Sequence, residues 1–213
     1  QAKTQRVFYA SSLATWTEIV STFSTHFHIG KMEIMDGFAF QMVSTNRIIN
    51  SNINTISTWP AGNFITKQIT QDVPRGLALL NNQLLAFGYE TVEVFYNAGL
   101  SPAPLGRLPH LATKIGLQAY FDTGTAAATN YYAVIGNKLY FNSNLGGAFA
   151  YDGARFEKIS TPTIDRILFE DKPRSVDHIS VMKEDVVSFR LSNLIAASTS
   201  RCSIEASIAA NSV

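Results

Sequence analysis

Residues 81–97, NNQLLAFGYETVEVFYN, contain the pattern that decides the fold. The turn pair at 81–82 is followed by an apolar run at 83–88, a short gap, and a second run at 93–97. Short runs rich in apolar and aromatic residues and bounded by turn residues are typical of β-strands, and two of them joined closely are typical of an antiparallel hairpin. The segment therefore predicts a β-hairpin.

The same pattern returns elsewhere in the chain. It is seen at 36–51, with runs at 38–43 and 47–51, and at 136–153, with runs at 138–141 and 148–153. A fainter fourth copy occupies 184–191, and a partial earlier one begins at 6–11. Successive turns lie roughly 45 to 55 residues apart, close to the repeat length of propeller blades.

A hairpin of this kind cannot bury both of its faces alone, so several must pack together. We therefore expect an all-β fold of β-propeller-like blades built from antiparallel hairpins, in which four or so blades leave the propeller incomplete. Blades are predicted over 1–168, and 169–213 is expected to add strands and an unassigned C-terminal segment to the same domain. Only 192–210 shows a helical apolar period.

Two segments read as surface excursions between blades. Residues 100–107 carry Pro102 and Pro104, and 122–130 are rich in Gly, Ala and Thr. The chain opens on Gln1 in mid-pattern, so we expect a piece of a longer or processed protein.

Composition narrows the function classes. Apolar residues make up 46% of the chain and charged residues 15%, which favours a surface covered by neighbouring proteins. Lys plus Arg number 17 against 16 for Asp plus Glu, so no strong field favours nucleic acid. The single cysteine, Cys202, excludes an internal disulfide framework and a Cys-based zinc site. The sequence contains neither a long apolar run nor a signal-peptide pattern, so it predicts neither membrane insertion nor secretion.

No spaced motif of a known catalytic or phosphate-binding site occurs in the sequence. His26 and His28 form a His-x-His pair, but no further ligand lies nearby in sequence. Glu90 and Glu93 resemble the paired carboxylates of a glycosidase, and we interpret them instead as solvated charges on an exposed turn.

Three further features receive structural interpretations. His110 and His178 are isolated, and Gly146-Gly147 is expected to serve a turn or bulge. We therefore predict no catalytic, cofactor-binding or metal-binding residue, no cofactor, and no enzyme activity. The aromatic residues of the strand-like runs are assigned to the core: Phe8, Tyr9, Phe38, Phe40, Phe87, Phe95, Tyr96, Tyr140, Phe149 and Tyr151.

Several segments resemble one protein family in the same order. Residues 87–99, FGYETVEVFYNAG, continued by PLGR at 104–107, are similar to the tail hub proteins of short-tailed bacteriophages, also called nozzle, packaged-DNA stabilisation or tail accessory proteins. DGFAF at 36–40, with Trp59 beyond it, and ISTPTID at 159–165 follow the same family. The resemblance runs from about Met32 to Leu168, although Leu105 stands where the family more often has Phe.

This resemblance implies a structural virion protein of the tail, made in the host cytoplasm. It implies a ring, usually hexameric, below the portal and adaptor, which extends the DNA channel and retains the packaged genome until ejection. The implied partners are further copies of the chain, the adaptor and portal, tail fibre, spike or needle proteins, and genomic DNA touched without sequence specificity. No catalytic residues accompany it.

Two alternatives remain open. One is a carbohydrate-binding or carbohydrate-cleaving propeller adhesin, in which Trp16 and Trp59 would lie exposed in one groove; tryptophans that recur at equivalent positions in the blades would be packing residues instead. Trp16 follows 6–11 much as Trp59 follows 47–51. The other alternative is a cellular propeller that acts as a generic interaction scaffold.

Overall fold

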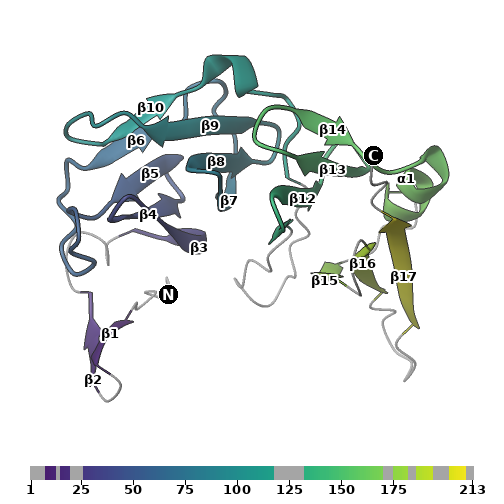
Figure 1. Cartoon of the computed structure of the whole chain (residues 1–213), viewed down its shortest axis with the longest axis horizontal. Helices are drawn as coiled ribbons and strands as arrows, with labels where there is room; N and C mark the ends of the chain where they lie inside the picture. The colour runs from purple at the N-terminus through teal and green to yellow at the C-terminus, as the bar shows by residue number, and fades with distance from the viewer. Residues whose placement is uncertain are drawn as a thin grey trace. The chain divides into compact units, whose positions relative to one another are not determined.

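The computed structural model describes residues 8–12, 15–19, 26–117, 132–169, 175–181, 186–193 and 202–209 (Figure 1). Strands dominate these residues, which confirms the all-β prediction, and the one α-helix among them is α1 (Pro162–Phe169). The chain divides into two compact units, Gln1–Thr113 (unit 1) and Lys114–Val213 (unit 2). None of the described helices has the length and apolar character needed to cross a membrane.

Unit 1 contains two four-stranded antiparallel sheets and a separate hairpin. In each sheet the strands follow one another in sequence order, so each sheet is a simple meander. The first consists of β3 (His28–Met35), β4 (Phe38–Val43), β5 (Arg47–Asn50) and β6 (Phe64–Thr66), and the second of β7 (Pro74–Leu80), β8 (Gln83–Gly88), β9 (Val92–Asn97) and β10 (Leu105–Arg107). The hairpin pairs β1 (Phe8–Ser12) with β2 (Thr15–Glu18).

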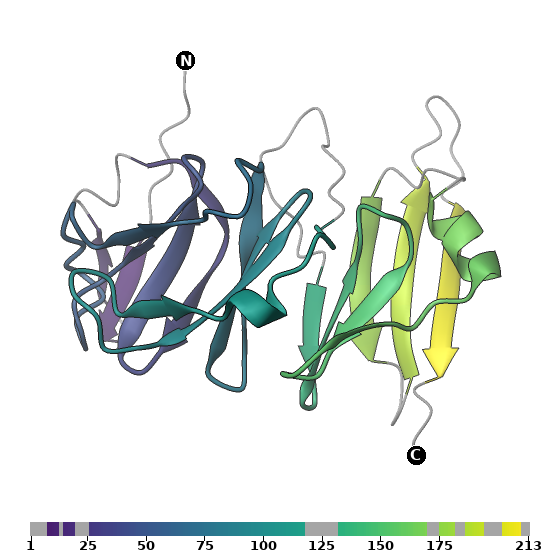
Figure 2. The same ribbon diagram turned by 90° about the horizontal axis from the view of Figure 1, so that it is seen from above.

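Unit 2 repeats the same meander. Its four-stranded sheet consists of β11 (Tyr132–Ile135), β12 (Lys138–Asn142), β13 (Ala148–Tyr151) and β14 (Phe156–Lys158). A three-stranded antiparallel sheet follows, with β15 (Ser175–Val181), β16 (Val186–Asn193) and β17 (Cys202–Ala209) in that order. Figure 2 shows both sheets with α1 beside the second.

The repeated hairpins predicted from sequence are the β4–β5, β8–β9 and β12–β13 pairs, all antiparallel. Each lies at the centre of a four-stranded sheet, the arrangement found in propeller blades. The faint fourth copy corresponds to β16, at the centre of the three-stranded sheet. The blade-like prediction is therefore confirmed at the level of the individual sheets.

The central strands are buried almost continuously. Five of the six residues of β4 and of β8 are buried, so both faces of these strands are covered. Side chains from the two sheets of unit 1 share one core, which includes Phe40, Met42, Ile48, Leu84 and Phe95. The first strands of the two sheets, β3 and β7, lie next to each other.

Gly30 and Gly76 make this close approach possible. A Cβ on Gly30 would lie 3.0 Å from the Cα of Gly76, and Gly30 has a φ of +71°. Both residues lie at irregularities of their strands, where the pairing register shifts. The two backbones therefore meet where neither residue carries a side chain.

Two expectations about elements are wrong. Residues 202–209, within the stretch given a helical period, form strand β17, because pairing with β16 outweighs a weak local periodicity. The predicted excursion at 100–107 ends in strand β10, whose Leu105 is buried against the core. Helix α1 was not predicted from sequence. The predicted excursion at 122–130 lies outside the described residues.

The assignment of aromatic residues to the core holds for most of them. In unit 2, the Phe141 and Phe149 rings stack at a centroid distance of 5.9 Å, and those of Tyr151 and Phe156 at 4.4 Å. Phe8 and Tyr96 are exceptions, since 47% and 41% of these residues are exposed. Phe8 lies on β1 and Tyr96 on β9.

Candidate functional site

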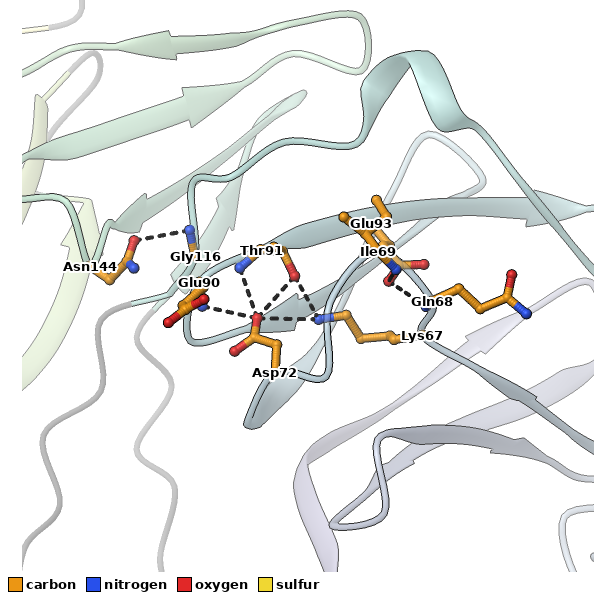
Figure 3. A network of polar contacts seen from close by, with 9 residues as sticks. All are labelled: Lys67, Gln68, Ile69, Asp72, Glu90, Thr91, Glu93, Gly116 and Asn144. Carbon is orange, nitrogen blue, oxygen red and sulfur yellow. Dashed lines mark hydrogen bonds and ion pairs between the residues drawn. The ribbon is translucent and has the colours of Figure 1, made fainter.

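A cluster of buried charged and polar side chains joins the two sheets of unit 1 (Figure 3). Lys67 and Asp72 lie on the segment that connects β6 to β7, and Thr91 lies between β8 and β9. The Lys67 and Asp72 side chains are 0% and 1% exposed. We call Lys67, Asp72 and Thr91, with Glu93 and Arg107 beside them, the Asp72 cluster.

Asp72 holds the turn between β8 and β9. Its Oδ2 atom accepts hydrogen bonds from the backbone N–H of Glu90 (2.9 Å), the backbone N–H of Thr91 (2.8 Å) and the Thr91 hydroxyl (2.9 Å). The Lys67 Nζ atom lies 3.7 Å from the same oxygen and donates to the Thr91 hydroxyl oxygen at 3.3 Å. The Lys67 and Asp72 side chains therefore both have internal partners.

Glu93 holds the connecting segment from the other side. Its Oε1 atom accepts the backbone N–H groups of Gln68 (2.9 Å) and Ile69 (3.1 Å). Its Oε2 atom lies 3.4 Å from Nε of Arg107, whose Nη2 donates to the carbonyl of Thr66. Glu93 is 2% exposed, so its interpretation as a solvated charge is wrong.

Glu90 and Glu93 do not form a carboxylate pair of the glycosidase kind. Glu90 is exposed, and its side chain takes no part in the cluster, whereas Glu93 points into it. The reason is that β9 begins as a strand buried on both faces, from Val92 to Phe95, so neither side of it is solvated. The sequence did contain a signal for the burial of Glu93. This carboxylate stands inside an otherwise apolar run, and an arginine, Arg107, ends the next strand.

Burial sets the electrostatics of the cluster. It lowers the pKa of Lys67, because the buried ammonium loses its hydration, while the charges of Asp72 and Glu93 act in the opposite direction. Gly88 leaves the space that the pair fills. A Cβ at Gly88 would lie 1.9 Å from Oδ2 of Asp72 and 2.5 Å from Nζ of Lys67.

A second, smaller group fixes helix α1 in unit 2. Asp165 on α1 accepts a hydrogen bond from the Ser160 hydroxyl and forms an ion pair with Lys158 on β14. The Ser160 Oγ atom also accepts the backbone N–H of Ala148 at 2.9 Å. We call these residues the Asp165 cluster. Pro162 begins the helix, where its missing N–H costs nothing.

Within each cluster, the carboxylate groups bind backbone N–H groups, hydroxyl groups or a neighbouring cation of the same cluster. Carboxylates that accept several internal N–H donors fix loops, and they are not available to a substrate. The chemistry that follows is structural: the Asp72 cluster fixes the segment 67–73 and the turn 89–91, and the Asp165 cluster fixes the start of α1.

The other residues considered from sequence lie apart. His28 is buried at the start of β3 and His26 is half-buried before it, and in the described part of the chain no three His, Cys, Asp or Glu side chains gather as a metal site. His110 is exposed in the 3-10 helix η2 (Pro109–Leu111), and His178 lies on β15. Gly146 and Gly147 lie in the turn between β12 and β13, both with positive φ.

The two tryptophans are not equivalent. Trp59 is 2% exposed and donates its Nε1–H to the carbonyl of Ile56 at 2.7 Å, in the loop between β5 and β6. Trp16 lies on β2 and is 70% exposed. Neither alternative therefore describes both residues: Trp59 is a packing residue, and the pair does not form an exposed platform.

Comparison with known proteins does not assign the chain to a family. The sequence matches no protein-family model. A search of curated proteins gives no significant match.

Proposed function

We propose that the chain is a non-enzymatic structural subunit of a short phage tail. In this proposal it forms part of the hub or nozzle ring below the portal and adaptor, extends the DNA channel and retains the packaged genome until ejection. It belongs to the virion and is made in the host cytoplasm. The observation that carries the proposal is that two of the three segments that resemble tail hub proteins contribute residues to the clusters that fix loops of the fold.

The first segment, residues 87–107, supplies Thr91, Glu93 and Arg107 to the Asp72 cluster, and Gly88 leaves the room for it. The second, residues 159–165, supplies Ser160 and Asp165 to the Asp165 cluster. A subunit that must hold its shape under the pressure of packaged DNA benefits from loops fixed by hydrogen-bonded carboxylates. The two segments therefore support a mechanical role.

Charge supports the same proposal. The formal net charge of the chain is +1, so a channel wall built from it would form few phosphate contacts and would let DNA slide. The proposed partners are further copies of the chain, the adaptor and portal, fibre, spike or needle proteins, and DNA without sequence specificity.

Electron microscopy and mass photometry of the purified chain, alone and mixed with a portal and adaptor assembly from the same source, test the proposal. A ring of about six subunits with an axial channel that docks on the adaptor is the expected result. A monomer that ignores the adaptor contradicts it.

Trp16 favours a second candidate function, a carbohydrate-binding adhesin. An indole that is 70% exposed can stack on a sugar ring. Glycans added to the chain would then quench a fluorescence component that is lost in Trp16→Phe. Equal quenching of the wild type and of this variant excludes stacking on Trp16.

A further inference from the structure

One end of unit 1 gathers the loops that the Asp72 cluster fixes. β3 and β7 begin at this end and β4 and β8 finish there, because His28 pairs with Val43 and Pro74 pairs with Gly88. The segment from β6 to β7 runs along it. We define this turn end by its residues: Phe27, 44–47, 66–75, 88–93 and Arg107.

Four large apolar side chains are exposed at the turn end. Phe27 is 41% exposed, Ile69 45%, Val73 54% and Tyr89 41%. Backbone hydrogen bonds connect the loops that carry them. Tyr89 N–H donates to the Val73 carbonyl and Ser44 N–H to the Phe27 carbonyl, both at 2.9 Å, and Lys67 N–H joins the two groups of loops by donating to the Asn46 carbonyl at 3.1 Å. Apolar residues exposed singly need no explanation, but a group on neighbouring loops marks an interaction surface.

The Asp72 cluster fixes the backbone of the loops that carry Ile69, Val73 and Tyr89 before any partner binds. Glu93 binds the backbone N–H of Ile69, and Asp72, which precedes Val73, binds the N–H of Glu90, which follows Tyr89. Loops that are already fixed lose little conformational entropy on binding, and such preorganisation raises affinity. The same loops therefore carry both the buried cluster and exposed apolar side chains.

At the turn end, the arginines are partly exposed, whereas most of the carboxylates are buried. Arg47, Arg75 and Arg107 are all partly exposed, whereas two of the three carboxylates, Asp72 and Glu93, are buried. Among the residues that define this end, Glu90 carries the one exposed carboxylate.

Aromatic rings restrain the three guanidinium groups. Their carbons lie 4.2 Å from the ring centroid of Phe64 for Arg47, 5.2 Å from Tyr89 for Arg75 and 5.5 Å from Phe95 for Arg107. Stacked arginine beside tyrosine is a common composition of protein interfaces. The exposed Ile69 and Val73 favour an apolar partner surface over a phosphate backbone.

We propose that the turn end of unit 1 binds a protein partner through a segment in which apolar side chains alternate with carboxylates. The apolar side chains would cover Phe27, Ile69, Val73 and Tyr89. The carboxylates would meet the partly exposed Arg47 and Arg75, because Arg107 already pairs with Glu93. The inference goes beyond the proposed tail function, which assigns no surface, and it holds whether or not the chain forms a ring.

The test uses the full chain and two short labelled peptides, identical in their leucines but alternating these with Asp in one and with Lys in the other. Fluorescence anisotropy measures their binding to the wild type, to Val73→Ser and Tyr89→Ala, and to the control Leu100→Ser. Leu100 is 57% exposed on the loop between β9 and β10, away from the turn end. Circular dichroism checks that each variant is folded.

We expect the Asp peptide to bind about 10-fold more tightly than the Lys peptide, because like charges across an interface are unfavourable. Val73→Ser and Tyr89→Ala are each expected to weaken binding of the Asp peptide by about 5-fold or more. Leu100→Ser should bind it as tightly as the wild type does. Equal binding of the two peptides, or an equal loss in Leu100→Ser, overturns the proposal.

Two further measurements identify other occupants. A DNA duplex that displaces the Asp peptide, and that itself binds more weakly to Val73→Ser, assigns the surface to nucleic acid. Self-association in mass photometry that Val73→Ser abolishes assigns it to a second copy of the chain. Either result overturns the proposal, and neither depends on whether a ring docks on an adaptor.

Discussion

Removing the charge of Asp72 is expected to destabilise unit 1 more than any change at the surface. Asp72→Asn keeps the shape of the side chain but leaves the Lys67 ammonium, which is 0% exposed, without its nearest counterion at 3.7 Å. Breaking a buried pair by removing one partner costs about 3–5 kcal/mol. We expect about 3 kcal/mol, because Glu93 still acts favourably on Lys67.

Urea unfolding followed by tryptophan fluorescence measures this effect selectively. Both tryptophans of the chain, Trp16 and Trp59, belong to unit 1, so the signal reports on that unit. With a slope of about 1–3 kcal/mol per molar urea, the midpoint should fall by about 1 M or more. Glu90→Gln is the matched control, since it removes an exposed charge on the same turn and should change stability by about 0.5 kcal/mol or less.

A double variant separates charge from packing. Lys67→Met combined with Asp72→Asn removes both charges, and neutral replacements of buried pairs are often tolerated. The double variant should therefore be about 2 kcal/mol more stable than Asp72→Asn alone. The reasoning is refuted if Asp72→Asn costs no more than the Glu90 control, or if the effects of the two substitutions simply add.

The pH dependence gives an independent check on Lys67. Its pKa in the folded chain lies below the ordinary value of 10.5, so between these two values the unfolded chain binds more protons. Stability therefore rises with pH across that window. The deficit of Asp72→Asn should narrow as the pH approaches 10.5, and a deficit that stays constant would mean that Lys67 is not the cause.

Three further changes test other parts of the packing. Gly88→Ala should cost unit 1 about 2 kcal/mol or more, because the new Cβ would lie 1.9 Å from a buried carboxylate oxygen, whereas Gly62→Ala, which meets nothing within 4 Å, serves as its control in the same urea assay. Burial raises the pKa of Tyr151 from 10.0 to about 12, so unit 2 should lose up to about 3 kcal/mol between these pH values, a loss that circular dichroism should not find in Tyr151→Phe. Trp59→Phe should cost about 2 kcal/mol and Trp16→Phe about 0.5 kcal/mol or less in thermal melts, and equal costs would contradict their different burial.

The repeated hairpins could be predicted because their signals are local. A turn pair such as Asn81-Asn82 takes up positive φ at both residues, and the apolar runs on either side are long enough to pair. Strand β10 was missed because Pro102 and Pro104 mark a loop, while the pairing of Leu105 with Asn97 is a tertiary event. Local chemistry identified where strands turn, and packing decided where they end.

The buried charges of unit 1 could not be predicted from local sequence. Glu93 looks solvated because it stands near Glu90 on a turn-like stretch, and Lys67 stands among polar residues. Their burial follows from the passage of the segment 67–73 across the β8–β9 turn, which depends on contacts such as that of Gln68 with Glu93. A charge is read correctly only when both faces of its strand are known to be covered.

The resemblance to tail hub proteins and the proposed docking surface share Tyr89, and otherwise depend largely on different residues. The segment 87–107 contributes mostly buried groups, such as Thr91 and Glu93, whose partners are internal. Residues of this kind preserve a fold, and proteins that share them can differ in what their surfaces bind. Of the four exposed apolar residues of the turn end, Tyr89 lies in that segment, whereas Phe27, Ile69 and Val73 lie outside it. Ring formation therefore tests the architecture that the resemblance implies, whereas the choice between the Asp and Lys peptides tests the chemistry of the turn end.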